Sequence, residues 1–491
     1  MKSKDPGWAG WRFDHSYARL PVSLFTRARP VPVASPSLVV LNEKLATELG
    51  LDVGHLRGSG ADLFSGNRLP SGADPIAQAY AGHQFGHFTN LGDGRAILLG
   101  EQLTPSGARF DVQLKGSGQT PYSRRGDGRA SLGPMLREYI ISEAMHALGI
   151  PTTRSLAVVA TGEEVFREEI LPGAVLTRVA ASHIRVGTFE YAAAMGDRVV
   201  LEALTRHTLT RHYPELVDAE NIALTLLGAV VERQADLVAR WMCVGFVHGV
   251  MNTDNMALSG ETIDYGPCAF LDTYDPETVF SSIDRGGRYA YGNQPDIAQW
   301  NLTRLAVALL PLIDGEQTKA VALAEEVLAK FPNEFRRKHQ SGLRSKIGLL
   351  SEEEGDDELA SELLDLMQSA GADFTSTFVA LTKSVETGQS EVIPVLGADS
   401  SVWLTRWRER LNRQNHTREV VAAVMQRANP VIIPRNHRVE EALAAAQSGD
   451  MSVLHRLLEA VVSPYEATPA NEPYRDAPPP GGAPYRTFCG T

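Results

Sequence analysis

The 491-residue sequence contains only three cysteines, Cys243, Cys268 and Cys489. So few cysteines exclude a disulfide-stapled fold of the secreted type in a chain of this length. The N-terminal segment also lacks the apolar stretch of a signal peptide, and no run approaches the ~18 apolar residues of a membrane-spanning helix. We therefore expect a cytoplasmic protein without a membrane partner.

An excess of positive charge is also missing. The chain has 47 Lys and Arg residues against 59 Asp and Glu residues, a formal net charge of −12. Non-specific nucleic-acid binding needs a net basic surface, so we expect no nucleic-acid partner. Hydrophobic residues make up 43% of the chain, enough for a large core, and the charge balance still leaves room for a local basic pocket.

The order of predicted elements indicates two lobes of different secondary structure. Strand-like alternation begins near residue 75, as in "RFDVQLK" at 109–115, and a single helix interrupts it in "GPMLREYIISEAMHALGIP". The dipeptides Thr161–Gly162 and Pro172–Gly173 predict turns between the short strands that follow. Helical periodicity begins after about residue 190, and the chain becomes proline-rich from Ser463. We predict an α+β fold with an N-terminal extension (1–75), a β-rich lobe (76–188), a large helical lobe (189–462) and a Pro-rich tail (463–491).

A strand lysine and a helix glutamate form the first candidate pair. Lys115 ends a predicted strand on its polar face, and Glu138 lies near the start of the one helix in that lobe. Protein kinases hold nucleotide phosphates with a lysine and a glutamate placed in this way. A surface lysine and an unrelated glutamate would be the ordinary alternative.

The pentapeptide "GDGRA" occurs twice, at 92–96 and at 126–130. Because glycine lets backbone amides approach phosphate oxygens closely, Gly92 and Gly94 are candidate contacts for a phosphate group. Their place one strand before Lys115 supports this interpretation. An ordinary hairpin turn is the alternative.

Arginines accumulate around the second copy and beyond it. The surroundings of Asp127 and Gly128 predict a second anion cradle, although a basic exposed loop would show the same pattern. The guanidinium group suits phosphate oxygens, and the alternative for the more distant arginines is an ordinary salt bridge. The residues concerned are Arg124, Arg125, Arg129, Arg178 and Arg185.

The segment "FVHGVMNTDNMALSGETIDYGP" at 246–267 resembles the metal-binding half of a kinase active site. A kinase catalytic loop has the pattern H-R-D-x-x-x-x-N, followed by D-F-G. With Asn255 as the metal-binding asparagine and Asp264 in the D-F-G position, Val250 takes the place of the catalytic aspartate. Asn255 and Asp264 are oxygen donors of the kind that Mg²⁺ prefers. Asp254 is the acid that remains beside them.

Each motif alone has an ordinary explanation, but their joint order along the chain resembles a known family, selenoprotein O (the bacterial YdiU type). The motifs that carry the resemblance are "AGHQFGHFTNLGDGRA", "VQLKGSGQTPYSRRGDGRA", "LREY", "HGVMNTDN" and "DYGPCAFLD", and it extends to the C-terminal "FCGT". The resemblance implies a protein-kinase-like two-lobed fold. It also implies transfer of AMP from ATP, or of UMP from UTP, to protein Ser, Thr or Tyr hydroxyls, with release of pyrophosphate. In this family ATP binds in a flipped orientation, with the α-phosphate facing the acceptor.

The resemblance also assigns roles to single residues. Asn255 and Asp264 would hold Mg²⁺ or Mn²⁺, Asp254 would accept the proton, and Glu138 would pair with Lys115. The implied partners are ATP, protein substrates that include redox-homeostasis proteins, and the chain itself as a substrate. The implied ATP contacts are Gly92, Gly94, Arg95, Lys115, Asp127, Gly128, Arg178, Arg185 and Asp264.

Two alternatives and one regulatory hypothesis remain. The alternatives are a kinase-type phosphotransferase, which Val250 disfavours, and a catalytically inactive nucleotide-binding scaffold, which the retained Lys115 and Asp264 disfavour. In the family that the chain resembles, many eukaryotic members carry selenocysteine near the C-terminus, where this chain has Cys489. Cys268 lies four residues after Asp264, so a reversible Cys268–Cys489 disulfide is the hypothesis, and two free thiols are its alternative.

Overall fold

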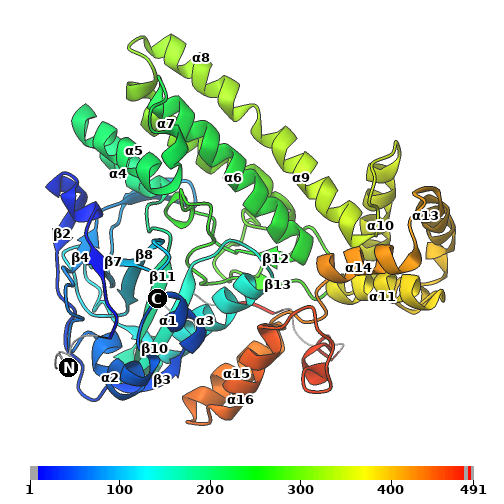
Figure 1. The fold of residues 1–491 in the computed structure, drawn as a ribbon, viewed down its shortest axis with the longest axis horizontal. Coiled ribbons are helices and arrows are strands. Elements are labelled where there is room, and N and C mark those ends of the chain that lie inside the picture. The colour runs from blue at the N-terminus through cyan, green and yellow to red at the C-terminus, as the bar shows by residue number, and fades with distance from the viewer. Residues whose placement is uncertain (1–8, 480–484, 488–491) are drawn as a thin grey trace.

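A sheet-rich region and a helical region lie side by side in the computed structural model, which describes residues 9–479 and 485–487 (Figure 1). The sheet-rich region, drawn in blue and cyan, extends to about the end of strand β11, and the helical region follows in green, yellow and orange. The predicted α+β organisation, with strands first and helices after, is confirmed.

Nine strands form one antiparallel sheet. The strand order is β2-β4-β7-β8-β11-β10-β3, with β1 paired to β7 and β9 paired to β11. The N-terminal 75 residues contribute three of these strands. The bounds are β1 Phe13–Asp14, β2 Phe25–Arg27, β3 Ser37–Leu41, β4 Ile76–Gln78, β7 Ala96–Leu103, β8 Arg109–Lys115, β9 Ala130–Ser131, β10 Arg154–Phe166 and β11 Ile170–Ala180.

Strand β8 separates an apolar layer from a polar one. Val112 and Leu114 point into a hydrophobic cluster that includes Phe64 of helix α2 (Val53–Ser65). The alternate residues Asp111, Gln113 and Lys115 are buried as well, although all three are polar. Because buried polar groups need partners, their burial predicts a polar network on that face of the sheet.

Two predicted turns are wrong. Thr161–Gly162 lies inside β10 and Pro172–Gly173 lies inside β11, and the two strands meet instead at residues 167–169. Gly162 has a φ of +71°, and the strand register shifts between Ala160 and Glu164. This is a β-bulge, which uses the same glycine that a turn would use. The sequence signal for a left-handed residue was correct, but its structural context was not.

Helix α3 (Leu132–Ala147) is the predicted helix of the sheet-rich region, and it is almost wholly buried. It packs against β10 and β11, and also against α15 (Asn436–Gln447) and α16 (Ser452–Val461). Figure 1 shows these two orange helices below α3 and away from the other helices. The C-terminal helices therefore cover the helix that carries Glu138.

Helix α6 (Ile222–Val244) is the central helix of the helical region and contacts α7, α8 and α9. Helical periodicity at 218–243, 296–313, 316–330, 356–370, 402–412, 417–428 and 438–449 predicts α6, α7, α8, α10, α13, α14 and α15. No range was predicted for α4, α5, α9, α11, α12 or α16. The polar run "NEFRRKHQ" in α9 obscures its helical periodicity. The remaining bounds are α1 Glu43–Glu48, α4 Val186–Ala194, α5 Arg198–His212, α7 Gln294–Ile313, α8 Gln317–Leu328, α9 Phe331–Lys346, α10 Asp356–Ala370, α11 Phe374–Thr387, α12 Ile393–Leu396, α13 Ser401–Arg413 and α14 Arg418–Ala428.

Two small hairpins position the loops between the two regions. Strands β12 (Phe246–Val247) and β13 (Ala269–Phe270) pair with each other and bracket the predicted catalytic segment. Strands β5 (Ala81–Gln84) and β6 (His87–Asn90) form a second hairpin, which packs against α4 and against the turn at 253–255. None of the helices within 9–479 is long and apolar enough to cross a membrane.

The described part of the Pro-rich tail packs onto the body. The Tyr485 hydroxyl accepts from Arg137 of α3 (2.7 Å) and donates to Glu440 of α15 (2.5 Å). Thr487 is buried, and its amide donates to the Phe280 carbonyl (2.8 Å). These residues join α3, α15 and the 267–282 segment.

Arg435 lies at the centre of a buried ion-pair cluster. The guanidinium group is 1% exposed and contacts Asp272 (2.8 Å) and Asp373 (2.6 Å). Because Arg435→Met would leave two partly buried carboxylates without their cation, we expect a loss of about 3–5 kcal/mol in the free energy of unfolding. Urea denaturation followed by circular dichroism measures it. The control is Arg406→Met, which breaks an exposed pair with Glu362 and should cost about 1 kcal/mol or less. Equal losses for the two variants would contradict this account.

Candidate active site

A cleft of about 510 Å³ lies between the sheet-rich and helical regions. Glu138 lies behind it, in contact with Lys115. Several lining residues were not singled out from the sequence, among them Tyr80, Phe85, Tyr122 and Asn252. The predicted site residues that line the cleft are Gly92, Gly94, Arg95, Lys115, Asp127, Gly128, Arg178, Arg185, Asp254, Asn255 and Asp264.

Lys115 joins the two regions through its ammonium group. Its Nζ lies 2.6 Å from Glu138 Oε2 on α3 and 2.6 Å from Asp264 Oδ1 in the loop before β13. Lys115 and Glu138 are both buried, so this charge pairing is well shielded from water. The Asp264 backbone has a φ of +64°, a conformation that residues other than glycine rarely adopt.

Two arginines complete a cationic ring around Asp264. Arg178 of β11 donates to Asp264 Oδ1 (2.8 Å), and the Arg185 guanidinium lies 3.8 Å from Oδ2. Burial of Asp264 opposes ionisation, but Lys115, Arg178 and Arg185 outweigh it and hold the Asp264 pKa well below its usual value. Three cations against the carboxylates of Asp264 and Glu138 leave positive charge in the cleft. Such a site favours an anionic ligand.

Asp254 and Asn255 line this cleft, and each has one side-chain oxygen without a hydrogen-bond partner. The Asn255 amide donates to the Val250 carbonyl (2.9 Å), while Asn255 Oδ1 and Asp254 Oδ1 are buried without a hydrogen-bond partner. Burial raises the Asp254 pKa to about 7. A Cβ on Gly82 would collide with the Asp254 carboxylate, so only glycine fits at this position of the β5–β6 hairpin.

The donor set suits a magnesium-type ion shared with a ligand. No cluster of three or more His, Cys, Asp or Glu residues that could hold a metal occurs within the described ranges. Mg²⁺ is commonly bound through one or two protein oxygens, with water and phosphate completing its coordination. The orphaned Asn255 Oδ1 and the carboxylate of Asp264 match that requirement.

The two "GDGRA" segments are brought together by the loop that joins β8 to β9. Gly92 has a φ of +103°, and an added Cβ would lie 2.5 Å from the Tyr122 ring. Gly94 accepts a hydrogen bond from the Ser123 hydroxyl, and Gly128 packs against Gly118. These glycines thus allow close packing of the loops, in addition to any contact with a phosphate.

The arginines of the second copy differ in their availability. Arg129 donates to the Val31 and Pro32 carbonyls (3.1 and 3.0 Å), and the Asp127 carboxylate is held by Arg167 (2.9 Å). Arg129 is therefore engaged in structural contacts. In contrast, Arg95, Arg124 and Arg125 have no ion-pair partner among the described residues, and Arg95 and Arg124 line the cleft.

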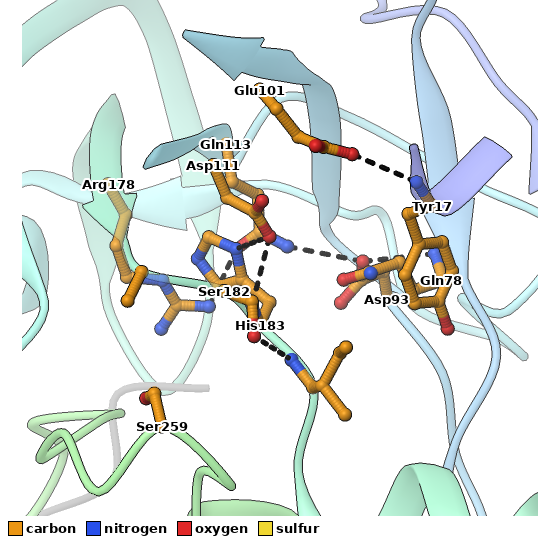
Figure 2. Close-up of polar contacts among 12 residues, drawn as sticks. Tyr17, Gln78, Asp93, Glu101, Asp111, Gln113, Arg178, Ser182, His183 and Ser259 are labelled. Carbon is orange, nitrogen blue, oxygen red and sulfur yellow. Dashed lines mark hydrogen bonds and ion pairs between the residues drawn. The ribbon is translucent and has the colours of Figure 1, made fainter. Parts of the chain in front are cut away.

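Gln113 and Asp93 form a supporting layer that sequence reasoning missed. Gln113 Oε1 accepts from Arg178 (2.6 Å), and its amide donates to Asp93 Oδ2 (3.2 Å), as Figure 2 shows. Asp93 Oδ2 also accepts from the main-chain amide of Gln78 (3.0 Å). Burial raises the Asp93 pKa to about 6. The side chain of the first "GDG" motif therefore points inward and orients a cleft arginine. The alternation of "RFDVQLK", which places Gln113 on the face of Lys115, was the available signal.

A second buried network holds the chain between Arg178 and Arg185. Asp111 accepts from the His183 amide (3.0 Å) and contacts its ring Nδ1 (3.1 Å), as Figure 2 also shows. Arg211 of α5 pairs with Asp111 (3.0 Å) and Glu101 (3.0 Å). This network anchors the segment that links β11 to α4 and carries Arg185 into the cleft.

The predicted Cys268–Cys489 disulfide is not tested by the structure because Cys489 lies outside the described residues. Cys268 is buried, and its carbonyl accepts from Arg137 (3.1 Å). Thr487, two residues before Cys489, donates its hydroxyl to the Pro267 carbonyl (2.9 Å). The tail therefore reaches the residue next to Cys268, and the disulfide stays a prediction.

The fold and the cationic cleft are kinase-like, and the comparisons with known proteins place the chain in the nucleotidyltransferase class. The family model described as "Protein adenylyltransferase SelO" matches residues 11–462. Proteins named "Protein nucleotidyltransferase YdiU" are similar over 98% of this chain. The protein of that name in Geobacillus kaustophilus is 60% identical over 485 residues, which cover 100% of it. The one in Brevibacillus brevis is 59% identical over 485 residues, which cover 98% of it. The relative of the same name in Syntrophotalea carbinolica is 58% identical over 487 residues, covering 98% of each chain. The chain belongs to the SelO family.

Replacement of Gln113 tests the supporting layer. Gln113→Leu would leave Arg178 and Asp93 buried with one partner fewer, and an unsatisfied charged group costs about 1–3 kcal/mol. We expect the dissociation constant for ATP, measured by calorimetry, to rise roughly 10-fold as Arg178 loses its orientation. Gln317→Leu, at an exposed position at the start of α8, is the matched control and should leave it unchanged. Unchanged ATP binding in Gln113→Leu would refute the positioning role.

Proposed function

We propose that this protein transfers AMP from ATP to Ser, Thr or Tyr hydroxyls of proteins and releases pyrophosphate. The observation that carries the proposal is the position of the acid. Val250, where a kinase has its proton acceptor, is buried and apolar, while Asp254 presents an unpaired carboxylate oxygen beside Asn255. The low cysteine content, three residues in 491, suits a reducing compartment, and the cytoplasm is the proposed location.

The cationic ring would hold the leaving group. Lys115, Arg178 and Arg185 surround Asp264 at the inner end of the site, and a triphosphate bound there offers them new anionic partners. With the β- and γ-phosphates in this ring, the α-phosphate faces Asp254. Mg²⁺ or Mn²⁺, held by Asn255 and Asp264, would neutralise phosphate charge. Electrostatic stabilisation of this kind is the main source of catalysis in phosphoryl-type transfer.

The chemical step is a single exchange at the α-phosphorus. The acceptor hydroxyl oxygen forms a bond to the α-phosphorus, and the bond to the bridging oxygen breaks and leaves its electron pair on pyrophosphate. Asp254 takes the hydroxyl proton. Burial raises the pKa of Asp254, which makes its carboxylate a stronger base than an exposed aspartate.

Isotopic labelling separates this function from its alternatives. The protein is incubated with Mg²⁺ and ATP labelled at either the α- or the γ-phosphate, with UTP labelled at the α-phosphate in a parallel reaction. We expect protein-bound label from α-labelled ATP and none from γ-labelled ATP. Label from the γ-position alone would indicate a kinase, and absence of label from every nucleotide would indicate a scaffold. Stronger labelling from UTP would replace AMP with UMP as the transferred group.

Asp264→Asn is the active-site variant that tests the metal assignment. It removes one negative charge from the cationic ring and weakens a metal ligand, so transfer should fall by at least about 100-fold. Asp296→Asn, in the exposed first turn of α7, should retain full activity. Asp254→Asn should slow transfer less, since general-base catalysis contributes less than metal and positioning. Full activity in Asp264→Asn would rule out the metal assignment.

A further inference from the structure

Two arginines stack on one tryptophan outside the cleft. The Arg288 guanidinium carbon lies 4.9 Å from the Trp300 ring centroid, and that of Arg304 lies 5.1 Å from it. Trp300 and Arg304 belong to α7, and Arg288 precedes that helix. Each contact is a favourable cation–π interaction, and together they place two positive charges beside one ring. We call Arg288, Trp300 and Arg304 together the Trp300 platform.

The Trp300 platform has no carboxylate partner among the described residues. Neither arginine forms an ion pair there, and the Nε atoms of both are buried without a hydrogen-bond partner. Asp284, four residues before Arg288, is engaged elsewhere: it accepts from the main-chain amides of Arg288 (3.0 Å) and Tyr289 (2.8 Å).

Glu190, which contacts the His83 ring beside Trp300, is also engaged. It binds the ring of His83 and accepts from the Thr253 hydroxyl (2.5 Å). In contrast, the buried arginines Arg410 and Arg435 each contact carboxylates. In a chain with 59 acidic and 47 basic residues, two adjacent half-buried arginines without an acid indicate a site for an external anion.

The platform lies next to the loop that carries Asp254. The His83 ring contacts Trp300 with a centroid distance of 5.4 Å, and the His83 amide donates to the Thr253 hydroxyl (2.6 Å). On the other side, the Tyr289 hydroxyl donates to Asn252 (2.6 Å), which lines the cleft. The platform is therefore one layer of side chains away from the proposed proton acceptor.

The anion in question is not the nucleotide. Arg288, Trp300 and Arg304 do not line the cleft, which has its own cations in Lys115 and the arginines of the ring. Phe88 lies against His83 with a centroid distance of 5.4 Å and is 47% exposed. An exposed aromatic side chain beside two unpaired cations suits a polypeptide with an acidic side chain better than a small inorganic anion.

We infer that the Trp300 platform binds an Asp or Glu side chain of the acceptor polypeptide, near the hydroxyl that receives AMP. This inference rests on the proposed function, since it assigns the acceptor side of the same site. The carboxylate would accept hydrogen bonds from these guanidinium groups and supply the anion that they lack. Such a contact would select acidic acceptor segments although the protein itself is acidic overall.

Peptide binding and AMP transfer test the inference together. Fluorescent peptides carry one central tyrosine and a single Asp at one of the positions from three before it to three after it, each matched to the Asn peptide. Wild-type protein should bind at least one Asp peptide about 10-fold more tightly than its Asn counterpart, the value of a charge-assisted hydrogen bond. The same peptide should show a lower KM for transfer of label from α-labelled ATP, with kcat little changed.

Three variants decide the role of the arginines. In R288Q/R304Q the preference for Asp should disappear while the dissociation constant for ATP stays unchanged. R285Q, at an exposed arginine of the same segment, should keep the preference. If R288Q/R304Q does not fold, R304Q alone should reduce the preference about 3-fold, as expected when one of two charged contacts is lost.

The outcomes separate this inference from the proposed function. Equal binding of Asp and Asn peptides by the wild type, or an unchanged preference in the arginine variants, would overturn the inference even if AMP transfer is observed. An Asp preference in binding that depends on the arginines, combined with no AMP transfer to any peptide or to the enzyme, would support the acidic-peptide site and overturn the proposed function.

Discussion

The cluster of charges around Asp264 is the interaction on which the site depends. Lys115 from the sheet, Arg178 from the adjacent strand and Arg185 from the start of α4 all approach one carboxylate, which is held with a φ of +64°. Two of these cations are themselves oriented from behind, Lys115 by Glu138 and Arg178 by Gln113. Since these three cations outnumber the carboxylates of Asp264 and Glu138 that they contact, the cleft is suited to an anionic ligand.

The surrounding structure can be understood as support for that cluster. Helix α3 presents Glu138 and is covered by α15 and α16, and Tyr485 of the tail ties α3 to α15. The β5–β6 hairpin closes over the acid, where Gly82 leaves room for Asp254. The site therefore lacks an acid at Val250 but keeps its cations, its oxygen donors and its backbone conformation. An enzyme that reacts at the α-phosphorus instead of the γ-phosphorus requires this combination, whereas an inactive site would not need to retain it.

Local sequence patterns predicted the elements whose formation depends mainly on residues close together in the chain. The alternation in "RFDVQLK" predicted β8 with Lys115 on its polar face, and helical periodicity predicted α3, which carries Glu138. The errors concern long-range context. Gly162 was predicted to lie in a turn but forms a bulge, because its strand continues along β11. The roles of Gln113 and Asp93 depend on neighbours 20 and 65 residues away in the chain, which no local pattern contains.

The central claim is that the triphosphate lies with its terminal phosphates in the cationic ring and its α-phosphate toward Asp254. A crystal structure of the protein with Mg²⁺ and a non-hydrolysable ATP analogue tests it most directly. The account predicts the γ-phosphate within hydrogen-bond distance of Arg178 or Arg185 and the α-phosphate nearest to Asp254. A γ-phosphate that points toward Asp254, with the adenine end at the ring, would contradict it.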